Sequence, residues 1–299
     1  MTPGRKWARD SRGRVVRAPE RPAASTSDGS GLSDQSDQSD QSDRHRKAAL
    51  KLALRLGFRD TYDHLGTVVL MSVAWALISA AGFFGAQSAA FRLFIGLPGQ
   101  LPALLSLLGG LAGVALTAGP FTAGTFRYAR NAAARREPEI FDLGWGFRSA
   151  LASSVALSAV QLAGAVLLGA NALFYVIQRH PLGLVVGAFF GYALAFWLLT
   201  CLYQWPLLVG QSGTERPAPM PTVLKKSALL VLDNFAFTLA LGAVVLVLTA
   251  ALWAAVVPAC VLWAGTLAVV LTQAIRELLR KYELLPPDPT LDPMSGEVE

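Results

Sequence analysis

Charge is scarce in this 299-residue sequence and is unevenly placed. Asp, Glu, Lys and Arg together make up 15% of the chain, whereas hydrophobic residues make up 53%. Five runs contain none of the four charged residue types: residues 65–91, 93–126, 149–178, 181–214 and 234–275. A soluble protein distributes charge along each amphipathic helix, so this pattern excludes an ordinary soluble domain. Each run exceeds the roughly 20 residues that cross a bilayer core of about 30 Å.

The uncharged runs predict an all-α, polytopic transmembrane bundle of about six spans. The first four runs accommodate one span each, near residues 65–86, 101–126, 150–177 and 182–205. The last run would reach about 63 Å as a single helix, which is twice the bilayer core, so we expect it to fold back. Pro258 marks the expected turn, and Trp253 and Trp263 beside it are typical of an aromatic belt at the outer interface. The last two spans are therefore predicted near 235–256 and 259–275.

Residue types that carry out chemistry are also rare. The three histidines and two cysteines are widely separated, without the spacing that a metal site requires. No Asp, Glu, Lys, Arg or His lies in the core of a predicted span. We therefore predict no catalytic residue, cofactor site or metal site. An enzyme acting on lipid would have only Asp142 and Asp233, at the inner interface, as candidate acids.

The rest of the chain divides around the predicted six-span domain over residues 64–282. Residues 1–46 form a tail with a basic segment and the repeat SDQSDQSDQSD at 33–43, which has no apolar side chain and is predicted to be disordered. The basic segment suits either a solvated tail or contact with a charged partner, and no nucleic acid is expected. Over residues 47–63, apolar side chains share one helical face among basic ones, which favours a helix in the membrane interface or, alternatively, a partner-binding helix. Residues 283–299 are predicted to be a short flexible tail.

Lysines and arginines lie almost entirely on one side of the predicted membrane. They precede the first span, follow the second, fourth and sixth, and leave only Arg92 and Arg179 on the opposite side. The positive-inside rule therefore places both termini in the cytoplasm. The predicted cytoplasmic anchor of the second span consists of Arg127, Arg130, Arg135 and Arg136. Abundant Ala, Leu, Arg and Gly are typical of a GC-rich bacterial genome, so we expect a multi-pass protein of the bacterial inner membrane.

The third predicted span carries a polar stripe. Six residues fall within about 160° of one another on a helical wheel: Ser154, Ser158, Gln161, Asn171, Tyr175 and Gln178. Amide side chains in a bilayer need hydrogen-bond partners, so this face is expected to turn inward. Two interpretations remain open: hydrogen bonds that hold the bundle together, or a wall that binds an uncharged solute such as a sugar.

The second predicted span contains a candidate kink at Gly119 and Pro120. Proline has no backbone N–H, so the carbonyl of Leu116 is expected to lose its helical donor. Nearby threonine hydroxyls are the kind of group that helps a membrane helix tolerate proline. Gly119 and Ala123 form a small-residue pair that allows another helix to approach closely. A packed kink and, alternatively, a hinge or a kink that faces a ligand are compatible with this pattern.

Two groups of residues occur in an order shared with a known family. They are Thr117, Gly119, Pro120, Thr122 and Ala123, and then Asp142, Trp145, Phe147 and Arg148. With the later segments PLLVGQ and LKKSALL, this order resembles the YesL-like bacterial integral membrane proteins over about residues 50–275. The resemblance implies a multi-span protein of uncertain function, often associated with carbohydrate uptake, and carries over no catalytic residue.

The resemblance and the charge-free spans together favour a non-enzymatic protein that assists a solute transport system. The expected partners are the lipid bilayer and the permease or ATPase subunits of a transporter. The alternative is an autonomous transporter or channel for a small neutral solute, which the polar stripe of the third span favours.

Overall fold

The structure is a computed structural model that describes residues 7–9, 15–17, 50–134, 138–178, 180–210, 216–254 and 256–282. The chain divides into two units, Met1–Arg44 and His45–Glu299. In the first unit, strands β1 (Trp7–Arg9) and β2 (Val15–Arg17) pair antiparallel. These six residues lie within the tail predicted over 1–46, and their valine and tryptophan residues favour strands. The repeat at 33–43 and the tail predicted over 283–299 lie outside the described residues.

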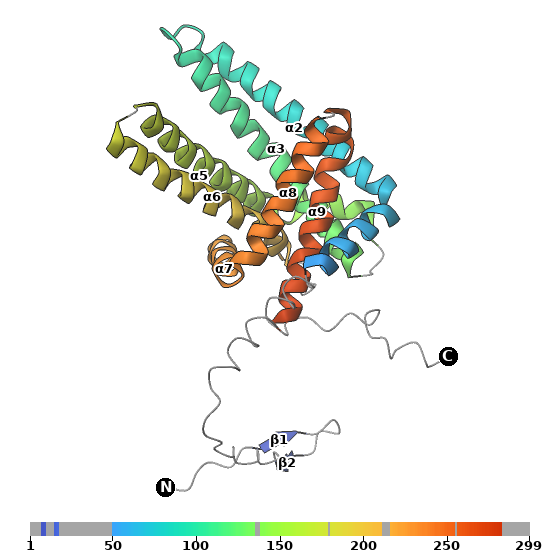
Figure 1. Ribbon diagram of the computed structural model, residues 1–299. Helices are drawn as coiled ribbons and strands as arrows, with labels where there is room; N and C mark the ends of the chain where they lie inside the picture. Colours follow the sequence, from blue (N-terminus) through green and yellow to red (C-terminus); the bar gives the residue numbers. More distant parts are fainter. Residues whose placement is uncertain are drawn as a thin grey trace, which may run out of the picture. The chain divides into compact units, whose positions relative to one another are not determined.

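The described part of the second unit is helical (Figure 1). Within it, six helices are long and apolar enough to cross a membrane: α2 (Leu65–Phe94), α3 (Leu101–Ala133), α5 (Leu151–Ile177), α6 (Pro181–Val209), α8 (Phe235–Ala254) and α9 (Val256–Lys281). Shorter helices cover residues 50–63, η1 (Ile140–Gly144), α4 (Trp145–Arg148) and α7 (Met220–Asp233). The predicted six-span helical fold is confirmed: this is a multi-pass membrane protein.

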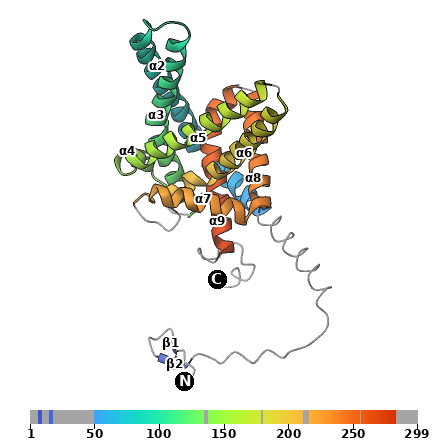
Figure 2. The same cartoon turned by 90° about the vertical axis from the view of Figure 1, so that its left-hand side faces the viewer.

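Two hairpins, α2–α3 and α5–α6, pack with α9, which also contacts α8 (Figures 1 and 2). The ends of the helices are joined by polar contacts. Arg130 Nη1 donates to the carbonyl oxygen of Val209 at 3.2 Å, and Lys281 Nζ donates to Asn234 Oδ1 at 2.8 Å. We call this end of the bundle, where α3, α6 and α9 end and α5 and α8 begin, the basic end.

Small residues allow α2 and α3 to approach closely. A Cβ atom on Gly113 would lie 2.1 Å from the carbonyl oxygen of Gly82, and one on Gly82 would lie 2.1 Å from Thr117 Oγ1. Thr117 Oγ1 in turn donates to the carbonyl oxygen of Ile78 at 3.3 Å. Lipid tails are as apolar as leucine side chains, so close backbone packing of this kind, rather than hydrophobic exclusion from water, stabilises helix pairs in a membrane.

The turn between the last two spans lies before Pro258 and not at it. α8 ends at Ala254 and α9 begins at Val256, so Pro258 is the third residue of α9. The first four backbone N–H groups of a helix have no partner within it, so a proline in this turn removes no hydrogen bond. The turn expected at Pro258 therefore lies a few residues earlier in the chain, between Ala254 and Val256.

The helix over residues 50–63 lies against α9. Leu56 is buried, and a Cβ atom on Gly57 would lie 3.2 Å from the Cα of Val270. Gln273 Nε2 donates a hydrogen bond to the carboxylate of Asp60. Burial raises the pKa of Asp60, and the hydrogen bond from Gln273 only partly opposes this effect. The carboxylate form is therefore less favourable in the folded protein than in the unfolded chain.

Asp60 predicts a pH dependence of stability. A raised pKa means that Asp60 contributes stability at low pH, and this contribution is lost as the pH rises from 3.8 through the higher pKa of the folded state. Asp60→Asn is expected to remove this loss, so the variant melts at a higher temperature than wild type at neutral pH. The difference in melting temperature between the two proteins is expected to be smaller in acid. Thermal unfolding in detergent across this range measures the effect. Asp63→Asn, on the same helix and exposed, is the control, and identical profiles for wild type and Asp60→Asn would contradict the prediction.

Candidate functional site

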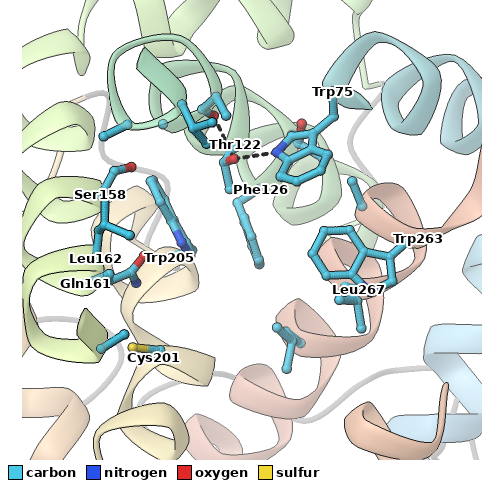
Figure 3. A pocket seen from close by; sticks show the side chains of 18 of the residues that line it. Trp75, Thr122, Phe126, Ser158, Gln161, Leu162, Cys201, Trp205, Trp263 and Leu267 are labelled. Atoms are coloured by element: carbon cyan, nitrogen blue, oxygen red, sulfur yellow. Dashed lines mark hydrogen bonds between the residues drawn. The ribbon is translucent and has the colours of Figure 1, made fainter. Parts of the chain in front are cut away.

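Five spans surround a cavity of about 440 Å³ (Figure 3). α6 contributes residues from its second half and α5 mostly from its first half, so the cavity lies towards the basic end. The lining residues are Trp75 of α2; Leu111, Val114, Ala115, Ala118, Gly119, Thr122, Thr125 and Phe126 of α3; Ser158, Gln161, Leu162 and Ala165 of α5; Leu198, Cys201 and Trp205 of α6; and Trp263, Ala264, Leu267 and Leu271 of α9. None of them is Asp, Glu, Lys, Arg or His.

Aromatic side chains form one wall of the cavity. The rings of Trp75 and Trp263 have centroids 5.1 Å apart, and Trp75 Nε1 donates to Thr122 Oγ1 at 2.9 Å (Figure 3). Trp263 Nε1 donates to Thr249 Oγ1 at 3.1 Å. Trp263, which is predicted from the sequence to lie in an outer belt, thus has an aromatic neighbour and a hydroxyl partner on two other helices. Trp253, the other residue of that belt, is 51% exposed.

The opposite wall carries the polar groups. Figure 3 shows Ser158 and Gln161 of α5 with Trp205 of α6 across the cavity from Trp75 and Trp263. Among the described residues, neither Ser158 Oγ nor Gln161 Oε1 has a hydrogen-bond partner. The two groups, one helical turn apart, are available to a bound molecule.

The amide of Gln161 is held in place by α6. Its Nε2 donates to Oε1 of the fully buried Gln204 at 2.8 Å, and Gln204 Nε2 donates to Thr200 Oγ1 at 3.4 Å. Trp197 Nε1 donates to the backbone carbonyl of Gln161 at 3.2 Å. These contacts fix the amide so that its oxygen is a preorganised acceptor. Gln204 was not predicted, although an amide in an apolar span is the same signal that identified Gln161.

The inner part of the predicted polar stripe reaches the cavity region. Ser158 and Gln161 line the cavity, and Ser154 is fully buried beside it with its Oγ donating to the carbonyl of Leu151 at 3.0 Å. A Cβ atom on Gly119 would lie 2.4 Å from Ser158 Oγ. The small residue at position 119 thus permits the close approach of α3 and α5 that frames the cavity.

The outer part of the stripe is directed elsewhere. Asn171 Nδ2 donates to the carbonyl of Leu167 on its own helix at 2.7 Å. Tyr175 stacks on Phe190 of α6 with ring centroids 5.9 Å apart, and Gln178 is exposed. The six residues therefore do not form one continuous wall, and the polar surface that faces the cavity ends at Gln161.

The candidate kink at Pro120 lies within one uninterrupted helix, α3. The hydroxyls of Thr122 and Thr125 donate to the carbonyls four residues before them, at 2.7 and 3.0 Å, so these bonds do not reach Leu116. The carbonyl of Pro120 faces a neighbouring segment instead, because a Cβ atom on Gly146 would lie 1.7 Å from it. Pro120 is thus part of a close contact between α3 and α4.

Arg127 of the predicted anchor makes an internal ion pair. Its Nε lies 3.0 Å from Asp142 Oδ1, and each side chain is 13% exposed. Asn131 Nδ2 donates to Asp142 Oδ2 at 2.8 Å, and the guanidinium lies 4.9 Å from the ring centroid of Trp145. These contacts fasten η1 and α4 to α3.

Arg130 is also directed into the protein. It is 4% exposed, and its Nη1 donates to the carbonyl of Val209 at the end of α6. Arg135 and Arg136, the other two residues of the predicted anchor, lie outside the described residues. Arg127 and Arg130 therefore hold elements of the basic end together in addition to carrying its charge.

The two candidate acids occupy different settings. Asp142 belongs to the half-buried ion pair with Arg127, whereas Asp233 is exposed and accepts a hydrogen bond from Tyr282 Oη at 3.1 Å. Neither lines the cavity. Within the described residues, no group of three or more His, Cys, Asp or Glu side chains is arranged to hold a metal ion.

No protein family, characterised protein or solved structure matches this chain. Of the resemblance to the YesL-like proteins, the structure therefore supports only that this chain is a six-span helical membrane protein.

Proposed function

We propose that this membrane protein binds a small uncharged molecule in the five-helix cavity, as the recognition step of solute transport, and that it is not an enzyme. The observation that carries the proposal is the lining of the cavity. It has no Asp, Glu, Lys, Arg or His, yet Ser158 and Gln161 present open hydrogen-bonding groups. Sites of this kind, mainly apolar with a few fixed polar groups, are typical for small ligands.

The lining also favours a particular solute chemistry. A charged solute has no counter-ion among the lining side chains, and transfer of an unpaired charge into an apolar site is strongly unfavourable. A sugar has several hydroxyls, more than the few open groups of this wall satisfy. A mainly apolar molecule with one hydroxyl or carbonyl group fits better, with its ring or chain against Trp75, Trp205 and Trp263.

The accessory role is the second candidate, and one observation favours it. Ile140 and Phe141 of η1 are 63% and 77% exposed at the basic end. Exposed apolar side chains next to a charged surface suit contact with a partner subunit. A pull-down from native membranes with wild type and with Ile140→Ser/Phe141→Ser tests this role: recovery of transporter subunits by wild type alone would support it.

The cavity can be tested through its own cysteine. Cys201 lines the cavity, and Cys260→Ala leaves it as the only thiol. Neutral methyl methanethiosulfonate is expected to modify Cys201 at least about tenfold faster than its trimethylammonium analogue, because the charged reagent must enter an apolar space. Intact-mass spectrometry of the protein in nanodiscs measures both rates. Equal rates would indicate a water-filled passage, and no modification by either reagent would indicate a closed space; both results contradict the proposal.

A matched pair of substitutions ties this reactivity to the cavity itself. Ala165→Phe fills the space and is expected to slow the neutral reagent strongly. Ala163→Phe adds the same side chain at an exposed position of the same helix and is expected to change little. If both variants behave alike, the reagent reaches Cys201 by a route other than this cavity.

A further inference from the structure

The helix over residues 50–63 presents a basic and aromatic face away from the bundle. Lys51, Arg55, Phe58, Arg59 and Tyr62 follow one another at intervals that place them on one side of a helix. All five are exposed, with Phe58 at 47% and Tyr62 at 78%. The other side of this helix is occupied by α9, so this face has no partner among the described helices.

The contact with α9 fixes the depth of this helix relative to the membrane. Gly57 packs against Val270, and Asp60 accepts the hydrogen bond from Gln273. Arg276 is the first charged residue of α9, six residues or about 9 Å beyond Val270. The helix over 50–63 therefore lies level with the last apolar turns of a spanning helix, which is where a bilayer meets water.

We propose that this face, formed by Lys51, Arg55, Phe58, Arg59 and Tyr62, binds anionic phospholipid headgroups. Guanidinium and ammonium groups form charge-assisted hydrogen bonds with phosphate oxygens, and clusters of basic residues beside a spanning helix attract anionic lipid. The aromatic residues lie towards the end that leads into α2, where rings favour the interface.

Neighbouring acids do not cancel the charge of this face. Arg59 lies 3.9 Å from Asp60 and 4.0 Å from Asp63, with the Arg59 side chain 52% exposed. Of these two acids only Asp63 is exposed, and an exposed ion pair contributes little. Lys51 and Arg55 have no acid within salt-bridge distance among the described residues. The proposal is independent of the function proposed for the cavity.

The test is native mass spectrometry of the full chain titrated with phosphatidylglycerol, which is anionic, and with phosphatidylcholine, which is zwitterionic. Wild type is expected to prefer phosphatidylglycerol, with an affinity that falls as salt is added. Lys51→Gln/Arg55→Gln/Arg59→Gln is expected to weaken phosphatidylglycerol binding at least about tenfold, because it removes the three cations that attract the anionic headgroup, and to leave phosphatidylcholine binding unchanged.

The control variant Arg148→Gln/Lys225→Gln/Lys226→Gln removes three exposed charges from α4 and α7 and is expected to retain most of the affinity. All six substituted side chains are exposed, so melting temperatures near that of wild type verify folding. If both variants weaken phosphatidylglycerol binding equally, the affinity depends on net charge and not on this face, and the proposal is overturned. The face would be assigned to another partner if the first variant binds lipid as wild type does but no longer recovers, from native membranes, a protein or nucleic acid that wild type recovers.

Discussion

Gly146→Ala is expected to destabilise the protein severely, whereas Gly144→Ala, two residues earlier, is expected to leave stability close to wild type. A Cβ atom on Gly146 would lie 1.7 Å from the carbonyl oxygen of Pro120 and 3.1 Å from the nitrogen of Gly124. Both neighbours are backbone atoms, so no side-chain rotation relieves the overlap. Gly144 has no atom within 4 Å of its added Cβ and has a φ of −73°, which alanine adopts readily.

The expected loss for Gly146→Ala is at least the roughly 1–3 kcal/mol typical of overpacking, since α3 and α4 must separate. Melting temperature in detergent and the monodisperse fraction in size-exclusion chromatography measure the effect. Gly124→Ala tests the adjoining contact of α3 with η1, because its Cβ would lie 2.1 Å from the carbonyl oxygen of Leu143. Melting of both variants at the temperature of wild type would mean that α4 does not pack on α3 in this way.

The spans were predictable because the bilayer imposes a simple condition on sequence. A helix needs about 20 apolar residues to cross it, and the uncharged runs show this directly. The turn near Pro258 was misplaced because proline breaks a helix interior but is tolerated in a first turn. Position within the helix, and not the residue type, decides the effect of proline, and the sequence alone does not give that position.

The cavity was only partly predictable for a related reason. Gln161 was expected to face inward because an amide in lipid needs a partner, and Gln204 is that partner. Trp75 and Trp263 carry no such constraint, since an indole is equally compatible with the membrane interface. Only the pairing of α2 with α9 places both rings in the cavity, and that pairing joins segments far apart in the sequence.

The structural role of Arg127 was not predictable from the charge pattern. Arg127 and Asp142 are 15 residues apart, and the positive-inside rule treats the arginine only as a topological signal. The ion pair exists because η1 folds back against the end of α3, where Asn131 and the backbone nitrogen of Glu139 also donate to Asp142. The same residue that was a candidate acid is, in the structure, an acceptor for three donors.

Asp142→Ala is therefore expected to cost at least about 1–3 kcal/mol of unfolding free energy, because it removes the acceptor of three hydrogen bonds at a site where the Arg127 and Asp142 side chains are each 13% exposed. Asp142→Asn is expected to cost less, since an amide oxygen still accepts a hydrogen bond. Asp233→Ala, at the exposed candidate acid, is the control and is expected to cost at most about 1 kcal/mol. Unfolding in detergent with increasing denaturant measures all three.

A second substitution separates a structural role of Asp142 from a catalytic one. Arg127→Met combined with Asp142→Ala removes both charges of this largely shielded pair, and replacing both partners of an ion pair away from solvent is less harmful than removing one of them. The double variant is therefore expected to be more stable than Asp142→Ala alone, with a coupling energy measured by the double-mutant cycle. If the ion pair has only a structural role, the double variant regains part of the stability that Asp142→Ala loses. If Asp142→Asn folds as wild type yet abolishes a cellular function that the double variant does not restore, Asp142 acts in chemistry, and the non-enzymatic proposal must be abandoned.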